Sequence, residues 1–100
     1  MKVTYATDDL ARLFTDIEFT DGLGIEVIRA YRKRITFIEA AEDERDFYAM
    51  KSLHFEKLSG KRSHQYSMRL NDQWRLIVEI ESGTPKNTIL VKSVENHYHQ

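Results

Sequence analysis

Residues 60–66 bring together side chains that bind phosphates and move protons. After a glycine, which lets the backbone turn freely, the run contains two cations, an imidazole and a phenol: Lys61, Arg62, His64 and Tyr66. Cations bind phosphate oxygens, an aromatic ring stacks on a base, and histidine exchanges protons near neutral pH. A solvated basic loop has the same composition, so the run alone leaves both interpretations open.

A further basic position, Arg75, lies in a strand-like stretch. Alternation places it on the polar face of that strand, as it places Arg69 on the polar face of the preceding one. We predict a two-residue hairpin turn at Asn71-Asp72, because both residues tolerate positive φ. That turn would set Arg75 across from residues 66–67, near the basic loop. A surface salt bridge is the alternative interpretation of a lone strand arginine.

The C-terminal residues form a third group. Residues 95–99 contain a glutamate, two histidines and a tyrosine. His-x-His can be half of a metal site, but the chain has no cysteine and no third ligand cluster supports it, so we predict no metal and no other cofactor. A proton-transfer site and a frayed tail both remain open.

These residue types would suffice for metal-free RNA cleavage. That reaction needs a base for the ribose 2′-hydroxyl, cations for the charge that builds on the phosphate, and an acid for the leaving 5′-oxygen. Many proteins contain the same types, so composition and spacing alone indicate only a basic surface on a small domain.

The charge distribution supports such a surface. The net charge is −1, yet residues 51–76 hold 6 Lys/Arg against 2 Asp/Glu, while residues 1–50 hold 7 against 11. Because a phosphate senses charge within about 8 Å at physiological salt, the local excess matters more than the total.

The elements that must position these groups follow from hydrophobic periodicity. A strand is expected in residues 1–6, then a short helix capped by Thr7. A long helix over residues 25–41 follows, with its buried face at Ile28, Tyr31, Ile35 and Ile38. A further short helical turn is expected around residues 47–50. From residue 65 the period changes to two, which predicts strands over residues 65–70, 74–81 and 88–94.

Helices first and a strand meander second indicate an α+β fold. We expect one domain, residues 1–100, with a small antiparallel sheet whose apolar face packs on the N-terminal helices. The first ten residues lack the apolar core of a signal peptide, and no apolar run approaches the roughly 20 residues of a membrane span. A cytoplasmic protein without a membrane partner is therefore the expectation.

Two blocks of this sequence resemble the HigB, or plasmid-maintenance killer, branch of the RelE toxin superfamily. Residues 58–62 fit the family pattern Leu-x-Gly-x-Arg, and residues 66–75 fit Tyr-Ser-x-Arg-x-Asn-x-Gln-Trp-Arg. The helical first half agrees in length and order, so the resemblance extends over essentially the whole chain.

The resemblance implies a type II toxin with a RelE-like fold that cleaves messenger RNA in the ribosomal A site without a metal, inhibiting translation. The products would be a 2′,3′-cyclic phosphate and a 5′-hydroxyl. The partner would be a HigA-type helix-turn-helix antitoxin, and operator DNA would be bound only through that complex. The alternative is a catalytically weakened domain that serves as antitoxin-binding partner and co-repressor.

Carried over by position, Arg62 and Arg75 would neutralise the scissile phosphate. An ungapped match sets residues 94–97 on the family's Val-Asp-Tyr-His, which makes His97 the general acid or base and Glu95 its acidic companion. A two-residue shift would select His99 instead. The RNA-binding set implied by the resemblance and the basic surface is Lys57, Lys61, His64, Tyr66 and Arg69.

Two positions depart from the family pattern. Ser59 stands where lysine is usual, with Lys61 as a substitute cation, and Asn96 stands where tyrosine is usual. These departures leave open a weak toxin or one with changed cleavage preference.

Overall fold

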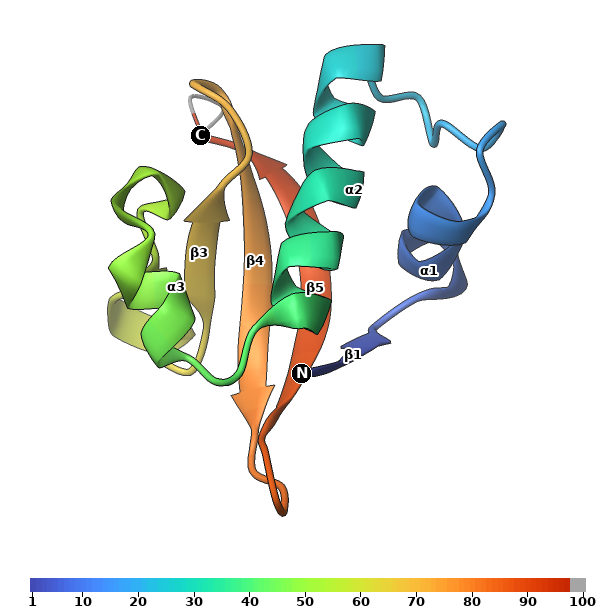
Figure 1. Ribbon diagram of the computed structural model, residues 1–100. Coiled ribbons are helices and arrows are strands. Elements are labelled where there is room, and N and C mark those ends of the chain that lie inside the picture. The colour runs from blue at the N-terminus through green and yellow to red at the C-terminus, as the bar shows by residue number, and fades with distance from the viewer. Residues whose placement is uncertain (98–100) are drawn as a thin grey trace.

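A computed structural model describes residues 1–97 of the chain. One strand precedes three successive helices, and the second half of the chain is a meander of strands, as Figure 1 shows. The strands are β1 (Lys2–Tyr5), β2 (Glu56–Lys57), β3 (Tyr66–Arg69), β4 (Trp74–Glu81) and β5 (Thr88–Asn96). The helices are α1 (Asp8–Thr15), α2 (Ile25–Ala40) and α3 (Arg45–Ala49), with 3₁₀ turns η1 (Lys51–Leu53) and η2 (Gly60–Arg62).

Helix α2 supplies most of the helical side of the core. Its predicted apolar face is confirmed, because Ile28, Tyr31, Ile35 and Ile38 are at most 1% exposed. They pack against the sheet residues Met68, Leu76, Val78, Ile89 and Val91 in one hydrophobic cluster. The helix ends one residue before the predicted boundary, with Ala41 as its C-cap. Among residues 1–97, no helix is long and apolar enough to span a membrane.

Helix α1 is joined to α2 by polar contacts as well as by packing. Thr7 caps α1 as predicted, because its Oγ1 accepts a hydrogen bond from the Leu10 N–H. The buried Tyr31 hydroxyl donates to the Leu10 carbonyl over 2.7 Å. Arg32 donates to the carbonyl oxygens of Leu13 and Asp16. The bonds from Arg32 satisfy carbonyl groups at the C-terminal end of α1, and together with the Tyr31 bond they hold α1 against α2.

The sheet has five strands in the order β1-β5-β4-β3-β2. The antiparallel pairing predicted for the meander is confirmed from β3 to β5, and β2, for which no strand was predicted, adds a short antiparallel strand beside β3. Strand β1 instead adds a parallel edge, with Lys2 paired to Thr88 and Tyr5 paired to Val91. The α+β class is confirmed, and the sheet is mixed at one edge. Figure 1 shows that α2 lies across one face of this sheet. We call the opposite face, which α2 does not cover, the outer face.

The hairpin between β3 and β4 differs from the prediction. Arg69 pairs with Arg75, and the Leu70 N–H donates to the Trp74 carbonyl, so three residues rather than two form the turn. The Asn71 side chain accepts hydrogen bonds from the N–H groups of Gln73 and Trp74, which stabilises this longer turn. The predicted pairing of Arg75 with residues 66–67 is therefore wrong, because Arg75 pairs with Arg69, at the end of β3 next to the turn.

A β-bulge interrupts the pairing of β4 with β5. Ile77 pairs with Ser93, while the next residue, Val78, pairs with Val91, so Lys92 is the extra residue. The bulge lets both Val91 and Val94 face the core, although they are three residues apart. It consequently turns Ser93 and Glu95 to the outer face. The predicted third strand also continues two residues beyond its predicted end, to Asn96.

The bond between α2 and α1 gives a stability test. Tyr31→Phe removes the donor to the partly buried Leu10 carbonyl while keeping the ring, so we expect a loss of about 1–2 kcal/mol in the free energy of unfolding. Urea denaturation followed by far-UV circular dichroism measures it. Tyr48→Phe, at a residue 60% exposed, is the matched control and should change stability by less than about 0.5 kcal/mol. Equal losses in the two variants would contradict a stabilising role for this bond.

Candidate active site on the outer face of the sheet

The outer face presents two cross-strand rows of side chains near the C-terminal end of β5. Arg69, Arg75 and Glu95 form one row, since Arg69 pairs with Arg75 and Arg75 with Glu95. Ser67, Ile77 and Ser93 form the next row by the same register. Side chains directly opposite one another across strands lie within about 5.5 Å at their Cβ atoms. The register thus brings two cations and one carboxylate together.

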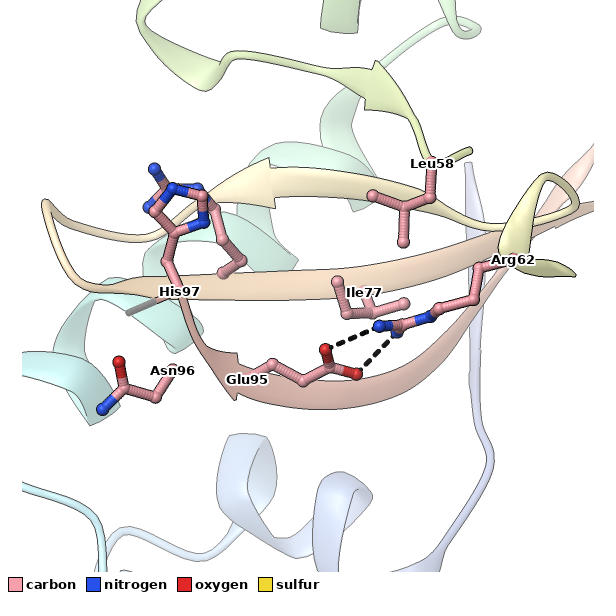
Figure 2. Close-up of a pocket in the computed structure, with 7 residues that line it drawn as sticks. Leu58, Arg62, Ile77, Glu95, Asn96 and His97 are labelled. Atoms are coloured by element: carbon pink, nitrogen blue, oxygen red, sulfur yellow. Dashed lines mark hydrogen bonds and ion pairs between the residues drawn. The ribbon is translucent and has the colours of Figure 1, made fainter. Parts of the chain in front are cut away.

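A pocket of about 240 Å³ lies over these rows. Its polar lining comes from Arg62, Arg75, Glu95, Asn96 and His97, and its apolar lining from Leu58 and Ile77 (Figure 2). Ile77 is only 3% exposed although it lies outside the main core cluster, because the segment around Leu58 crosses above it. The four residues predicted to be catalytic therefore line one pocket. We call it the outer-face pocket.

Arg62 and Glu95 form a two-bonded ion pair across the pocket. The Arg62 Nη1 and Nη2 atoms lie 3.0 and 2.7 Å from the two carboxylate oxygens of Glu95 (Figure 2). These hydrogen bonds lower the pKa of Glu95, while partial burial raises it and a bond from the Ser93 hydroxyl lowers it further. The same pair raises the pKa of Arg62. Glu95 is therefore ionised at neutral pH and occupies the edge of Arg62 that a phosphate would use.

Arg75 is positioned by the β3–β4 hairpin. Its Nη1 donates to the backbone carbonyl of Asn71 over 2.8 Å and to that of Trp74 over 3.2 Å. Arg75 also faces the cation Arg69 across the strands, a repulsive arrangement that an ion pair between Arg69 and Asp72 counters. The turn thus holds the Arg75 side chain through two backbone carbonyls, and it supplies Asp72, whose negative charge offsets the positive charge of Arg69.

Arg62 is supplied by residues 58–65, called here the basic loop. The Leu58 N–H donates to the Gln65 carbonyl over 2.9 Å, and the Gln65 N–H donates to the Arg62 carbonyl over 2.8 Å. Gly60 adopts a φ of 66°, a left-handed conformation that favours glycine, at the first residue of η2. The predicted backbone freedom of Gly60 is thus used to fold the loop back over the sheet.

The C-terminal end of the described chain is joined to the same hairpin. The His97 N–H donates to the Gln73 carbonyl, directly after Asn96 pairs with Trp74. Glu95 and Asn96 lie in β5, so the frayed-tail interpretation, one of the two left open, does not hold for these two residues. The alternative imidazole, His99, lies outside the described residues. Among those described, no three histidine or acidic side chains form a candidate metal cluster.

The predicted RNA-binding residues lie on two sides of the sheet. Arg69 is on the outer face, and Lys61 and His64 are exposed on the basic loop. Tyr66 faces the helices instead, where its ring stacks on Phe55 with centroids 5.0 Å apart. Lys57 pairs with Tyr66 across the strands and so lies on that same side. The structure places Arg69 and His64 on the outer face, His64 through its contact with Glu79, leaves Lys61 exposed on the basic loop, and places Lys57 and Tyr66 on the opposite side.

Several residues of this site were missed by sequence reasoning. Gln65 and Glu79 are joined by a hydrogen bond of 3.0 Å, and Gln65 also accepts one from Arg62 Nε over 2.9 Å. Ser93 donates to Glu95. Gln65 and Glu79 fall on the polar positions of the alternation in their strands, but nothing in their spacing indicates that they contact Arg62.

Comparison with solved structures defines the class of fold. A YoeB/ParE toxin from Agrobacterium tumefaciens superposes with a TM-score of 0.58 over 98% of this chain and 100% of its own, at 14% sequence identity. Identity this low supports a shared fold only. No curated protein matched the sequence.

A family model supplies the more specific assignment. The model of the RelE-like toxin of the type II toxin-antitoxin system HigB matches residues 3–93. The chain belongs to this family, as the motif resemblance predicted, and membership implies an antitoxin partner. The match includes Arg62 and Arg75 and ends before Glu95 and His97.

The Arg62–Glu95 pair predicts a pH-dependent stability. A carboxyl group whose pKa is lowered on folding contributes stability above its ordinary pKa of 4.5 and loses it as pH falls through the lowered value. Wild type should therefore be more stable than Glu95→Gln at neutral pH, with a difference that shrinks below about pH 4.5. Urea denaturation at a series of pH values measures it. Glu81→Gln, at an exposed residue of β4, is the control, and a Glu95 difference independent of pH would contradict the ion pair.

Proposed function

We propose that this toxin is an endoribonuclease that cleaves messenger RNA on the ribosome and thereby inhibits translation. The observation that carries the proposal is the outer-face pocket, which combines two arginines, a glutamate and a histidine around a volume of about 240 Å³. Membership of the HigB-like family supports the same activity. The required groups come from three separate segments of the chain, which the fold gathers at one end of the sheet.

The proposed chemistry is metal-free general acid–base catalysis. The 2′-oxygen attacks the phosphorus, its proton passes to a base, and the P–O5′ bond breaks as an acid protonates the leaving oxygen. This gives a 2′,3′-cyclic phosphate and a 5′-hydroxyl. His97 and Glu95 provide the proton-transfer groups, and Arg62 and Arg75 neutralise charge on the phosphate. For the phosphate to reach Arg62, Glu95 must leave it, which also frees the carboxylate for proton transfer.

RNA outside the scissile linkage would lie along the exposed cations. Arg69 and His64 lie on the outer face and Lys61 is exposed on the basic loop, so these three are the stronger candidates for this contact. Lys57 remains a candidate for a more distant phosphate, because it is exposed on β2. Tyr66 would act through its stacking on Phe55, which supports the start of β3, rather than on a base.

The proposed partners and location follow from the family. We assign a HigA-type helix-turn-helix antitoxin as the neutralising partner, ribosomes with their messenger RNA as the target, and the cytoplasm as the compartment. Operator DNA would be bound only through the toxin–antitoxin complex. These assignments can be examined in the gene next to this one, which should encode a helix-turn-helix protein.

A second candidate function is a weakened toxin that serves as antitoxin-binding partner and co-repressor. The observation that favours it is the ion pair itself, since Arg62 is neutralised by Glu95. Ser59 and Asn96, which replace a family lysine and tyrosine, favour it as well. This alternative expects soluble, folded protein to be harmless when it is produced without an antitoxin.

Induction of the protein alone in a bacterium distinguishes the two candidates. We expect growth arrest and new messenger RNA 5′ ends inside translated codons, detected by primer extension. Arg75→Ala and His97→Ala should each lower cleavage by about a hundredfold, because a lost transition-state contact costs that much or more. Arg29→Ala, at an exposed position of α2, should keep full toxicity. Normal growth with intact message would favour the weakened toxin, and full toxicity of both pocket variants would place the active site elsewhere.

A further inference from the structure

The side chain of Arg62 is held on two edges by different groups. Its Nη1 and Nη2 atoms contact Glu95, while its Nε–H donates to Oε1 of Gln65 over 2.9 Å. A guanidinium can bind an oxyanion through its two Nη atoms or through Nε and one Nη. Because Gln65 occupies Nε, only the Nη edge is directed to the pocket.

Gln65 is itself oriented by the sheet. Its Nε2 donates to Oε2 of Glu79 over 3.0 Å. Glu79 lies on the outer face of β4, with its side chain 23% exposed, and the same oxygen is 3.6 Å from His64 Nε2 and 3.9 Å from Lys92 Nζ. A carboxylate cannot donate, so the amide nitrogen of Gln65 must face Glu79 and its oxygen must face Arg62. The amide is therefore held in one orientation.

The need for such support comes from where Arg62 lies. It belongs to the 3₁₀ turn of the basic loop, and its side chain is 46% exposed. The backbone of Gln65 closes that loop through the bond to Leu58, but backbone closure leaves the long arginine side chain free to rotate. The chain Glu79–Gln65–Arg62 connects this side chain to a rigid central strand.

We propose that Gln65, oriented by Glu79, is a positioning residue that commits Arg62 to present its Nη edge to the scissile phosphate. In the free protein Glu95 holds that edge. When a phosphate replaces Glu95, the contacts on the Nε edge remain, so Arg62 keeps its place through the exchange. This inference rests on the proposed ribonuclease activity for its catalytic consequence, but its geometric content does not depend on cleavage.

Exchange of the Gln65 and Glu79 side chains gives the sharpest test of the positioning role. Gln65→Leu removes both hydrogen bonds and should lower kcat for cleavage on programmed ribosomes by about tenfold, the order expected for a hydrogen bond to a charged group. Gln65→Glu should lower it similarly, because the new carboxylate faces Glu79. The double variant Gln65→Glu with Glu79→Gln restores the bond between the two side chains with its direction reversed, because the amide at position 79 donates to the carboxylate at position 65, which can still accept from Arg62 Nε. Its activity should return to within about threefold of wild type. Glu81→Gln is the charge control on the same strand.

A second comparison, made in the Arg62→Lys variant, tests whether Gln65 acts by positioning Arg62 or through a general structural role. In Arg62→Lys, which keeps a cation but has no Nε–H, Gln65→Leu should have little further effect on kcat. An equal loss in both backgrounds, or no recovery in the exchanged pair, would overturn the proposal.

Proton exchange at Arg62, measured by NMR without any RNA cleavage, tests the positioning role of Gln65 separately from the ribonuclease proposal. The Arg62 Nε–Hε signal in a ¹H–¹⁵N spectrum, assigned by its loss in Arg62→Lys, should exchange slowly with water in wild type and rapidly in Gln65→Leu. Inorganic phosphate should shift signals of Glu95 while this proton stays protected. Unchanged exchange in Gln65→Leu would refute the positioning role even if cleavage is found. Protection by Gln65 in a protein that cleaves nothing would refute the ribonuclease and leave the positioning geometry intact.

Discussion

The β-bulge at Lys92 is the constraint on which the outer-face pocket depends. Strand β5 must bury Ile89 and Val91 against α2 and must also bury Val94, which strict alternation would expose. One extra residue resolves the conflict by reversing the phase of the strand between Val91 and Val94. Burial of apolar groups and presentation of Glu95 are thus two results of one backbone irregularity. A straight β5 would direct Glu95 into the hydrophobic core, where an ionised carboxylate is strongly disfavoured.

The basic loop depends on the sheet in a different way. Its ends are closed by backbone bonds at β2 and β3, and its apolar side is supported where Leu58 covers Ile77. On the other side of the sheet, Tyr66, the first residue of β3, stacks on Phe55, which in turn contacts Phe47. An exposed basic segment is therefore supported by aromatic packing on the opposite face. Tyr66 thus supports the strand that follows the basic loop while its ring faces away from the outer-face pocket.

Much of the fold could be predicted from the sequence because it follows local periodicity. The 3-4-3 spacing of Ile28, Tyr31, Ile35 and Ile38 fixed the face of α2, and the period of two fixed the faces of β3 and β4. The turn length was wrong because Asn71 and Asp72 suit several turns, and only the side-chain bonds of Asn71 select the three-residue form. The parallel pairing of β1 is a long-range choice that six residues do not encode. The bulge left a trace, since Val91 and Val94 are three residues apart in a stretch otherwise of period two.

For the site, residue types were easier to predict than contacts. Arg62, Arg75, Glu95 and His97 could be proposed from the motifs, and the structure places them around one pocket. The pairing of Arg62 with Glu95 spans 33 residues, and the roles of Gln65 and Glu79 depend on side-chain conformations that no spacing specifies. Lys57 and Tyr66 are predicted to bind RNA because they lie near the basic residues in the sequence, but the period of two sets Tyr66 on the same face as Met68, which is the core face.

The position of Trp74 has a practical consequence. It is the only tryptophan in the chain, it lies beside Arg75, and it pairs with Asn96 across β4 and β5. Its half-buried indole packs against the core, and its backbone N–H is bound by the Asn71 side chain. Fluorescence excited at the red edge of protein absorption therefore arises from this one end of the sheet. The molecule carries an intrinsic optical reporter, placed so that movement of the hairpin or of the C-terminal part of β5 changes its emission without any attached label.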